Sequence, residues 1–131
     1  MDHEAAFTKA FIMSEKRARF IQALAQPRHR KELLERMSHD LPYMPGFAQV
    51  VPGTQDFPAE LEKLLKAKGA GPTCHLIADG LKVDGRELPL REALELVCLH
   101  ERGAILSCVP GRLAYYKPES PGPGIVLERT R

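Results

Sequence analysis

The chain has 131 residues, and its 44% hydrophobic and 27% charged residues are typical of a globular protein and exclude wholesale disorder. Nineteen basic and 17 acidic residues leave a formal charge of +2, which gives no general attraction to a polyanion such as nucleic acid. No hydrophobic run approaches the ~18 residues of a membrane-spanning helix, so no membrane partner is expected.

The compartment is predicted from the start of the chain and from its cysteines. The first residues lack the hydrophobic stretch of a secretory signal. The chain has three cysteines, an odd number that suits free thiols better than a disulfide framework. Both features favour a reducing compartment, and we expect a cytoplasmic protein with one domain over residues 1–131.

Residues 1–40 predict a helical N-terminal part. From residue 7 to residue 25 the hydrophobic residues recur along one stripe of a helix, and Ser14 falls in that stripe. One long helix fits this pattern, and so does a break in which the Ser14 hydroxyl caps a second helix that begins at Glu15. The sequence favours the break. The stripe consists of Phe7, Phe11, Ala18, Ile21 and Ala25.

Prolines and glycines divide the middle of the chain. Residues 28–38 predict a helix, after a proline that interrupts the preceding pattern. Three prolines and two glycines in residues 41–57 prevent regular structure of any length, so a long loop is expected there. Because this loop contains Tyr43 and Phe47, it either packs across the domain or presents a hydrophobic docking surface. A proline then begins a helix over residues 58–68.

A sheet is predicted to begin after this helix. Residues 73–78 form a hydrophobic run that suits a strand buried on both faces. Asp84 and Gly85 supply the positive φ angles that a two-residue turn requires. This turn predicts a short hairpin between residues 81–83 and 86–88.

The last third of the chain predicts one more helix and further strands. Residues 89–102 begin with a proline and carry a wide hydrophobic arc, which predicts a helix buried against the sheet. Residues 104–109 and 112–117 predict two antiparallel strands whose Pro-Gly connection favours extra loop residues or a bulge. In the tail of residues 118–131, which is rich in Pro and Gly, residues 125–127 are a candidate edge strand; otherwise the end frays.

The fold class is therefore α+β. A small, mostly antiparallel sheet is expected over residues 73–117, with residues 125–127 as a candidate further strand. The N-terminal helices and the inserted helix of residues 89–102 are expected to pack against it. Only 6% of the residues are aromatic and none is Trp, so aliphatic side chains must form most of the core.

Cysteine and histidine are the residue types that bind zinc, and five of them occur in the sheet region. Cys74 and His75 are neighbours that point to opposite faces of a strand, and Cys98 and His100 lie far apart around a helix. Cys74 and Cys108 can approach each other across adjacent strands, but free cysteines are common in protein cores. We expect no metal site and no cofactor.

Cys108 is also a candidate nucleophile, with His75 or His100 as its base. No helix N-terminus or neighbouring cation is predicted to lower the pKa of this thiol, so a filling role in the core is favoured over catalysis. We assign no catalytic residue.

The start of the helix at residues 28–38 is basic. Arg28, Arg30 and Lys31 form a candidate phosphate-binding turn. A solvated helix start is the favoured interpretation, because a short basic run in a charge-balanced chain gives little affinity for nucleic acid.

The strand at residues 112–117 carries two adjacent tyrosines between two cations. Tyr115 and Tyr116 point to opposite faces, so one of them is expected to be exposed. Together with Arg112 and Lys117, an exposed tyrosine suits stacking on a base or anchoring a protein partner. The alternative is packing against neighbouring strands on a half-exposed face.

The leading hypothesis is a non-enzymatic cytoplasmic module for protein–protein interaction or regulation. It depends on a self-sufficient core, on the absence of a catalytic motif and on hydrophobic side chains in surface segments. The alternative is a nucleic-acid-binding protein that uses residues 28–31 and 112–117. A second alternative is an enzyme of unrecognised type that uses Cys and His. The residues expected to contact a protein partner are Tyr43, Phe47, Arg112, Tyr115, Tyr116 and Lys117.

Overall fold

The computed structural model describes residues 2–119 and 122–129, and within them it confirms the α+β fold, with five α-helices and a sheet of six strands. The elements are α1 (His3–Phe11), α2 (Arg17–Ala25), α3 (Pro27–His39), β1 (Ala48–Val50), α4 (Pro58–Ala67), β2 (Thr73–Ala78), β3 (Glu87–Pro89), α5 (Leu90–Leu99), β4 (Ala104–Val109), β5 (Leu113–Lys117) and β6 (Ile125–Glu128). The strands lie in the order β1-β6-β5-β4-β2-β3, and each adjacent pair is antiparallel.

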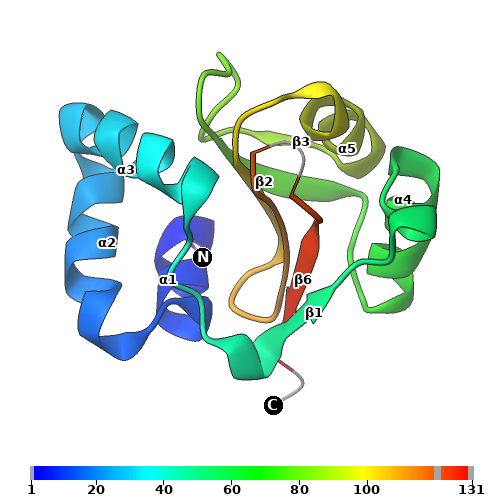
Figure 1. The fold of residues 1–131 in the computed structure, drawn as a ribbon, viewed down its shortest axis with the longest axis horizontal. Coiled ribbons are helices and arrows are strands. Elements are labelled where there is room, and N and C mark those ends of the chain that lie inside the picture. The colour runs from blue at the N-terminus through cyan, green and yellow to red at the C-terminus, as the bar shows by residue number, and fades with distance from the viewer. Residues whose placement is uncertain (1, 120–121, 130–131) are drawn as a thin grey trace.

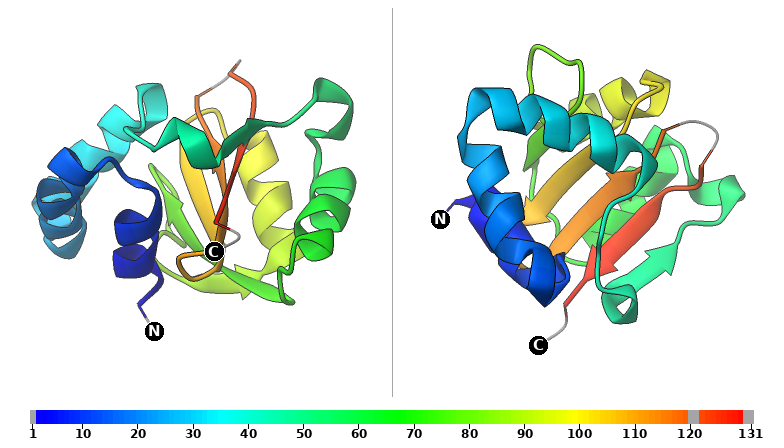
Figure 2. Two further views of the ribbon diagram at one scale, coloured as in Figure 1. Left: turned by 90° about the horizontal axis from the view of Figure 1, so that it is seen from below. Right: turned by 60° about the vertical axis from the view of Figure 1, so that its left-hand side comes forward.

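Helices cover both faces of the sheet. α1, α2 and α3 lie on one side, and α4 and α5 lie on the other (Figures 1 and 2). None of the helices in the part of the chain that the structure describes is long and apolar enough to cross a lipid bilayer.

The sheet separates two hydrophobic cores, because successive residues of a strand point to opposite faces. In β4, Ile105 belongs to the core beneath α1, α2 and α3, and Leu106 belongs to the core beneath α4 and α5. Both side chains are fully buried. The strands at the centre of the sheet are therefore hydrophobic on both faces, as predicted for residues 73–78.

The break between the first two helices is confirmed, but Ser14 does not cap the second one. α1 ends where Ile12 becomes extended and pairs with Tyr43. The Ser14 hydroxyl lies 3.3 Å from the carboxylate of Glu15 and contacts no backbone N–H at the helix start. The chain leaves the helical path because Ile12 finds a partner in a distant segment.

This break changes which residues of α2 face the core. The predicted stripe places Ala18 and Ala25 on the buried side, but both are exposed. Phe20 and Leu24 are buried instead. The reason is that α2 starts again at Arg17 and does not continue the rotation of α1.

Pro58 is the first residue of α4 as predicted, where the missing N–H would have no helical partner. The helix predicted to begin at residue 28 starts one residue earlier, because Pro27 is itself the first residue of α3. α5 is shorter than the predicted range of residues 89–102, because Pro89 belongs to β3 and His100 is extended.

The predicted hairpin between residues 81–83 and 86–88 is wrong in its pairing. Gly85 has the expected positive φ of 81°, but its N–H donates to the carbonyl of Leu76 at 2.7 Å. The N–H of Leu76 in turn donates to the carbonyl of Arg86 at 2.9 Å. The segment that leads into β3 is therefore already paired with β2, and residues 81–83 lie in the turns that join these two strands.

Residues 41–57 are more regular than the predicted long loop. β1 lies within them and pairs with β6, flanked by single 3-10 turns at Pro45–Phe47 and Gly53–Gln55. The candidate strand at residues 125–127 is confirmed as β6, but β1 covers its outer side, so β6 lies inside the sheet.

The connection between β4 and β5 has the predicted irregularity. Gly111 has a φ of 71°, and the N–H of Arg112 donates to the carbonyl of Val109 at 2.9 Å, as in a four-residue turn. The pairing of the two strands shifts between Ser107 and Val109, which is the expected bulge.

Candidate functional site

The two tyrosines of β5 are buried, and the expectation that one of them is exposed is wrong. The Tyr115 hydroxyl donates to Asp56 at 2.6 Å on the side of α4 and α5. The Tyr116 hydroxyl donates to the backbone carbonyl of Met37 on the side of α3. Because helices cover both faces of the sheet, neither ring is free to stack on a base or to enter a partner.

Tyr43 and Phe47 are half-buried and pack on the protein's own aromatic residues. The Tyr43 ring lies 6.4 Å from the ring of Tyr116, and the Phe47 ring meets Phe11 edge-on at 6.4 Å. The guanidinium of Arg129 lies 4.4 Å from the centre of the Phe47 ring. Residues 41–57 were expected either to pack across the domain or to present a docking surface, and these contacts agree with packing across the domain.

The basic residues named as candidates are dispersed. Arg28, Lys31 and Arg112 are exposed, but Arg30 is enclosed by carboxylates. Lys117 donates to a backbone carbonyl at the end of α5 at 2.9 Å. The two basic segments therefore offer fewer free cations than the sequence suggests.

Arg30 joins α1, α3 and the turns after β2. Its guanidinium donates to Glu4 at 2.6 and 2.9 Å and to Asp84 at 2.8 Å through each of two nitrogens. Hydrogen bonds to Asp84 and Glu4 raise the pKa of Arg30 above its usual range. Asp84 also accepts from the N–H of Ala78 at 2.9 Å, so this turn is held by side chains distant in the sequence.

Two histidines extend this group of charges. His75 Nε2 lies 2.8 Å from the Glu4 carboxylate, and the ring of His3 stacks on that of His75 at 5.3 Å. Burial raises the pKa of Glu4, but hydrogen bonds from His75 and Arg30 outweigh it and lower this pKa to about 2. Burial, followed by the His75 ring, lowers the pKa of His3.

The hydroxyl of Ser107 also belongs to this group of side chains, and its position decides whether it can react. His3 Nδ1 lies 2.8 Å from Ser107 Oγ, but Ser107 is only 1% exposed in the middle of β4. A substrate cannot reach this oxygen, so the arrangement lacks the accessible nucleophile that catalysis requires. These residues bind one another and fasten α1 and α3 to the sheet.

The sheet separates the candidate base His75 from the two buried cysteines. Cys74 and Cys108 lie in the core beneath α4 and α5, whereas His75 faces the opposite side of the sheet. Burial raises the pKa of Cys74 to about 12 and that of Cys108 further still. Burial also raises the pKa of Cys98, which is half-buried. These thiols therefore carry little thiolate at neutral pH.

Residues 2–119 and 122–129 contain no group of three or more His, Cys, Asp or Glu side chains placed to hold a metal ion.

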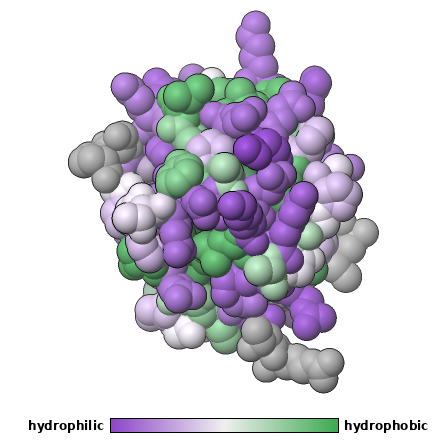
Figure 3. Space-filling model, turned by 90° about the vertical axis from the view of Figure 1, so that its right-hand side faces the viewer, coloured by the Kyte–Doolittle hydropathy of each residue, from purple (hydrophilic) through white to green (hydrophobic). Residues whose placement is uncertain are grey.

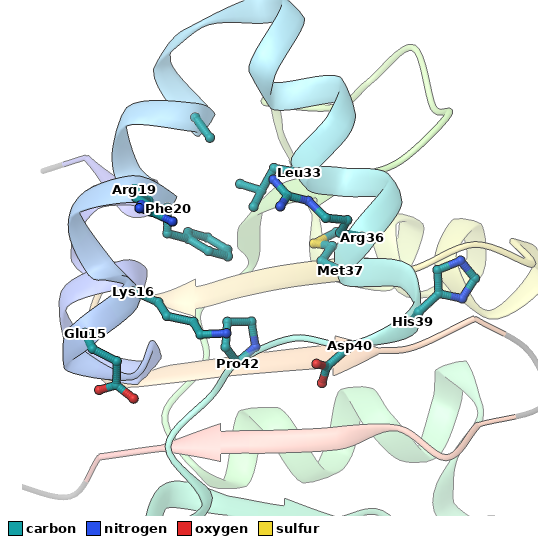
Figure 4. Close-up of a pocket in the computed structure, with 11 residues that line it drawn as sticks. Glu15, Lys16, Arg19, Phe20, Leu33, Arg36, Met37, His39, Asp40 and Pro42 are labelled. Carbon is teal, nitrogen blue, oxygen red and sulfur yellow. The ribbon is translucent and has the colours of Figure 1, made fainter.

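A hollow of about 560 Å³ opens between α2 and α3. The two helices are joined by Gln26 alone and spread apart away from this joint (Figure 4). Phe20 from α2 and Leu33 and Met37 from α3 form a hydrophobic floor. Phe20 and Met37 are 3% and 1% exposed, so they are firmly seated in the core that the hollow adjoins.

A charged rim surrounds this floor. Lys16, Arg19 and Arg36 supply positive charge, and Glu15 and Asp40 supply negative charge. Figure 4 shows Arg36 reaching from α3 into the space between the helices. Residues 14–40 together carry seven Lys or Arg against four Asp or Glu, so this side of the molecule is more basic than the whole chain.

The volume and lining of the hollow are those of a binding site. Its volume lies within the range of about 300–1,000 Å³ that ligand-binding clefts span. A hydrophobic floor inside a polar rim is also the arrangement found at protein interfaces.

The hollow is not evident from the sequence. Phe20 and Met37 are visible as hydrophobic residues of two consecutive helices, but the predicted stripe of α2 was rotated away from Phe20. A separate helical pattern begun at Arg17 would have placed Phe20 and Leu24 on one face. No residue pattern within α2 or α3 predicts that the two helices spread apart.

No protein-family model matches the chain, and neither the curated proteins nor the solved structures contain a significant match. Function is therefore inferred from the side chains of this protein alone.

Proposed function

We propose that this chain is a non-enzymatic module that binds another protein, and that the partner docks in the hollow between α2 and α3. The observation that supports this most is the hydrophobic floor of Phe20, Leu33 and Met37 between two helices that spread apart. Grooves of this kind accept hydrophobic side chains from one face of a partner helix or from an extended segment. Methionine suits such a floor, because its flexible thioether adapts to different contacts.

The rim indicates the charge of the partner. Lys16, Arg19 and Arg36 outnumber Glu15 and Asp40. A segment in which a large hydrophobic residue is flanked by acidic residues therefore complements both the floor and the rim. Such charge complementarity raises the association rate and discriminates against basic partners.

The two alternatives from the sequence have weaker support. An enzyme based on Cys and His would need an accessible thiolate, but burial raises the pKa of Cys74 and Cys108. For nucleic-acid binding, Arg30 is not available to a phosphate, because two carboxylates neutralise it. The rings of Tyr115 and Tyr116 are buried and cannot stack on bases. The three cysteines are free, which agrees with the cytoplasm as the proposed compartment.

Selection of displayed random peptides on the immobilised full chain tests this proposal. We expect enriched peptides to combine a large hydrophobic residue with Asp or Glu. Their binding should be lost in the variant that carries Arg19→Glu and Arg36→Glu, because both substitutions reverse the charge of the rim.

The matched control carries Arg28→Glu and Lys31→Glu, the same change of charge at exposed residues outside the hollow. This control should bind the peptides as the unaltered chain does. A selection that enriches nothing above background, or peptides that bind the rim variant as well as the control, would contradict the proposal. Salt-sensitive binding of an oligonucleotide that only the control substitutions weaken would favour the nucleic-acid alternative.

A further inference from the structure

α5 presents an acidic face with two exposed leucines. Leu99 is 88% exposed and Leu96 is 37% exposed, which places them among the four large hydrophobic residues that are exposed in the described part of the chain. They are three residues apart in a helix and lie on the same side of it. Glu92 and Glu95 precede them by four residues each and are also exposed, and Arg91 lies 3.8 Å from the Glu95 carboxylate beside this face.

This face has the composition that the hollow requires. Its leucines match the floor of Phe20, Leu33 and Met37, and its glutamates match the excess of positive charge on the rim. The structure therefore points to a specific occupant: we infer that the α5 face of one copy docks in the hollow of a second copy. This inference rests on the proposed function, because it requires the hollow to be a protein docking site.

The placement of the two surfaces determines the form of the assembly. The hollow lies with α2 and α3 on one side of the sheet, and α5 lies on the other side (Figures 1 and 2). A molecule cannot fill its own hollow, and two molecules cannot fill each other's hollow by a single two-fold contact. Each copy instead offers one hollow and one helix face, which produces a head-to-tail chain of copies.

The association is expected to be weak. Figure 3 shows that hydrophilic residues cover most of the side formed by α4 and α5, with hydrophobic residues reaching the surface among them. Complexes that bury less than ~1,200 Å² of surface are typically weak and transient, and a contact through one helix end buries less than this. Monomers therefore dominate in dilute solution, and chains of copies form as the concentration rises.

Sedimentation velocity of two complementary variants tests this inference. The hollow variant carries Arg19→Glu and Arg36→Glu and keeps its α5 face. The helix variant carries Leu99→Glu and keeps its hollow. The unaltered protein should increase in average mass with concentration, and each variant alone should stay monomeric. An equimolar mixture of the two variants should form a dimer and nothing larger, because only one compatible pair of surfaces remains.

Two further variants keep the result interpretable. Val50→Glu makes the same substitution at another exposed residue, on β1, and should associate as the unaltered protein does. If the doubly charged hollow variant loses its helical circular dichroism, Arg36→Gln takes its place and should weaken association several-fold.

Three results would overturn the inference: an unaltered protein that stays monomeric at every concentration, a helix variant that associates normally, or a mixture that yields no dimer. A monomeric protein that still binds the selected peptides in its hollow refutes the second copy as occupant and leaves the proposed function standing. Absence of both self-association and peptide binding contradicts both.

Discussion

Replacing Arg30 with Met tests how the N-terminal helices are fastened to the sheet. Arg30 donates four hydrogen bonds of 2.6–2.9 Å to Glu4 and Asp84, and the three side chains are only 14–20% exposed. Without the guanidinium, two enclosed carboxylates lie near each other with no cation between them. Burial of unpaired charge and repulsion between like charges both oppose folding.

The structure sets the size of the effect. Breaking a buried ion pair costs about 3–5 kcal/mol, and the residual exposure of these side chains places Arg30→Met near the lower end of that range. The pKa of Glu4 is lowered to about 2 by hydrogen bonds from both His75 and Arg30, so part of the stabilisation of this carboxylate remains when Arg30 is replaced. We therefore expect Arg30→Met to reduce the free energy of unfolding by about 3 kcal/mol.

Urea unfolding followed by far-ultraviolet circular dichroism measures this loss. Lys31→Met is the matched control, because Lys31 is an exposed neighbour on the same helix, and its effect should stay within about 0.5 kcal/mol. Adding Arg30→Met to the double variant Glu4→Gln and Asp84→Asn should cost far less than Arg30→Met alone. A loss below about 1 kcal/mol for Arg30→Met, as for a surface ion pair, would refute the reasoning.

The same interaction predicts a dependence on pH. The pKa of Glu4 is lower in the folded protein than its ordinary value of 4.5, so its contribution is fully present above about pH 5 and is lost as the pH falls toward 2. The difference in unfolding free energy between the unaltered protein and Glu4→Gln should therefore shrink over this interval. A difference that stays constant from neutral pH into this range would show that the carboxylate is not held as described.

Two further predictions concern the other side of the sheet. Gly124→Ala should cost about 1–3 kcal/mol in urea unfolding, because an added Cβ would lie 2.3 Å from the Tyr115 hydroxyl, whereas Gly53→Ala meets no atom within 4 Å and should change stability little. Cys74 and Cys108 should react with a soluble thiol reagent at neutral pH only as fast as the protein unfolds, because both are buried with raised pKa values; rapid labelling of either thiol in the native protein would contradict this.

Local chemistry made much of the fold predictable. Pro58 marks the first residue of α4, because proline has no N–H to leave unpaired there. Gly111 marks the turn between β4 and β5, because it adopts a positive φ. In each of these cases the residue that predicts the structure lies within a few residues of the helix start or turn that it determines.

Contacts between distant segments explain what the sequence did not predict. Asp84 and Gly85 suggested a two-residue hairpin turn, but Asp84 instead binds Arg30 and the N–H of Ala78. β1 was predicted as loop because prolines surround it, yet its three residues pair with β6 near the other end of the chain. The pattern of neighbouring residues contains no information about such partners.

The candidate site was missed for a related reason. The side chains expected to face a partner, Tyr115 and Tyr116, are buried because helices cover both faces of β5, which a single strand does not reveal. The hollow forms where α2 and α3 spread apart, and the orientation of α2 follows from the pairing of Ile12 with Tyr43. A contact between distant segments thus determines which hydrophobic residues line the proposed docking site.

Nuclear magnetic resonance of methionine methyl groups offers the most direct test of the proposed docking site. Met37 lies in the floor of the hollow, whereas Met44 lies outside its lining, where its sulfur contacts Arg17, and serves as the internal reference. Addition of a selected acidic, hydrophobic peptide should shift the Met37 methyl signal and produce cross-relaxation between this methyl group and the peptide. Saturation with a bound peptide that leaves the Met37 signal unchanged would contradict the assignment of the hollow as the docking site.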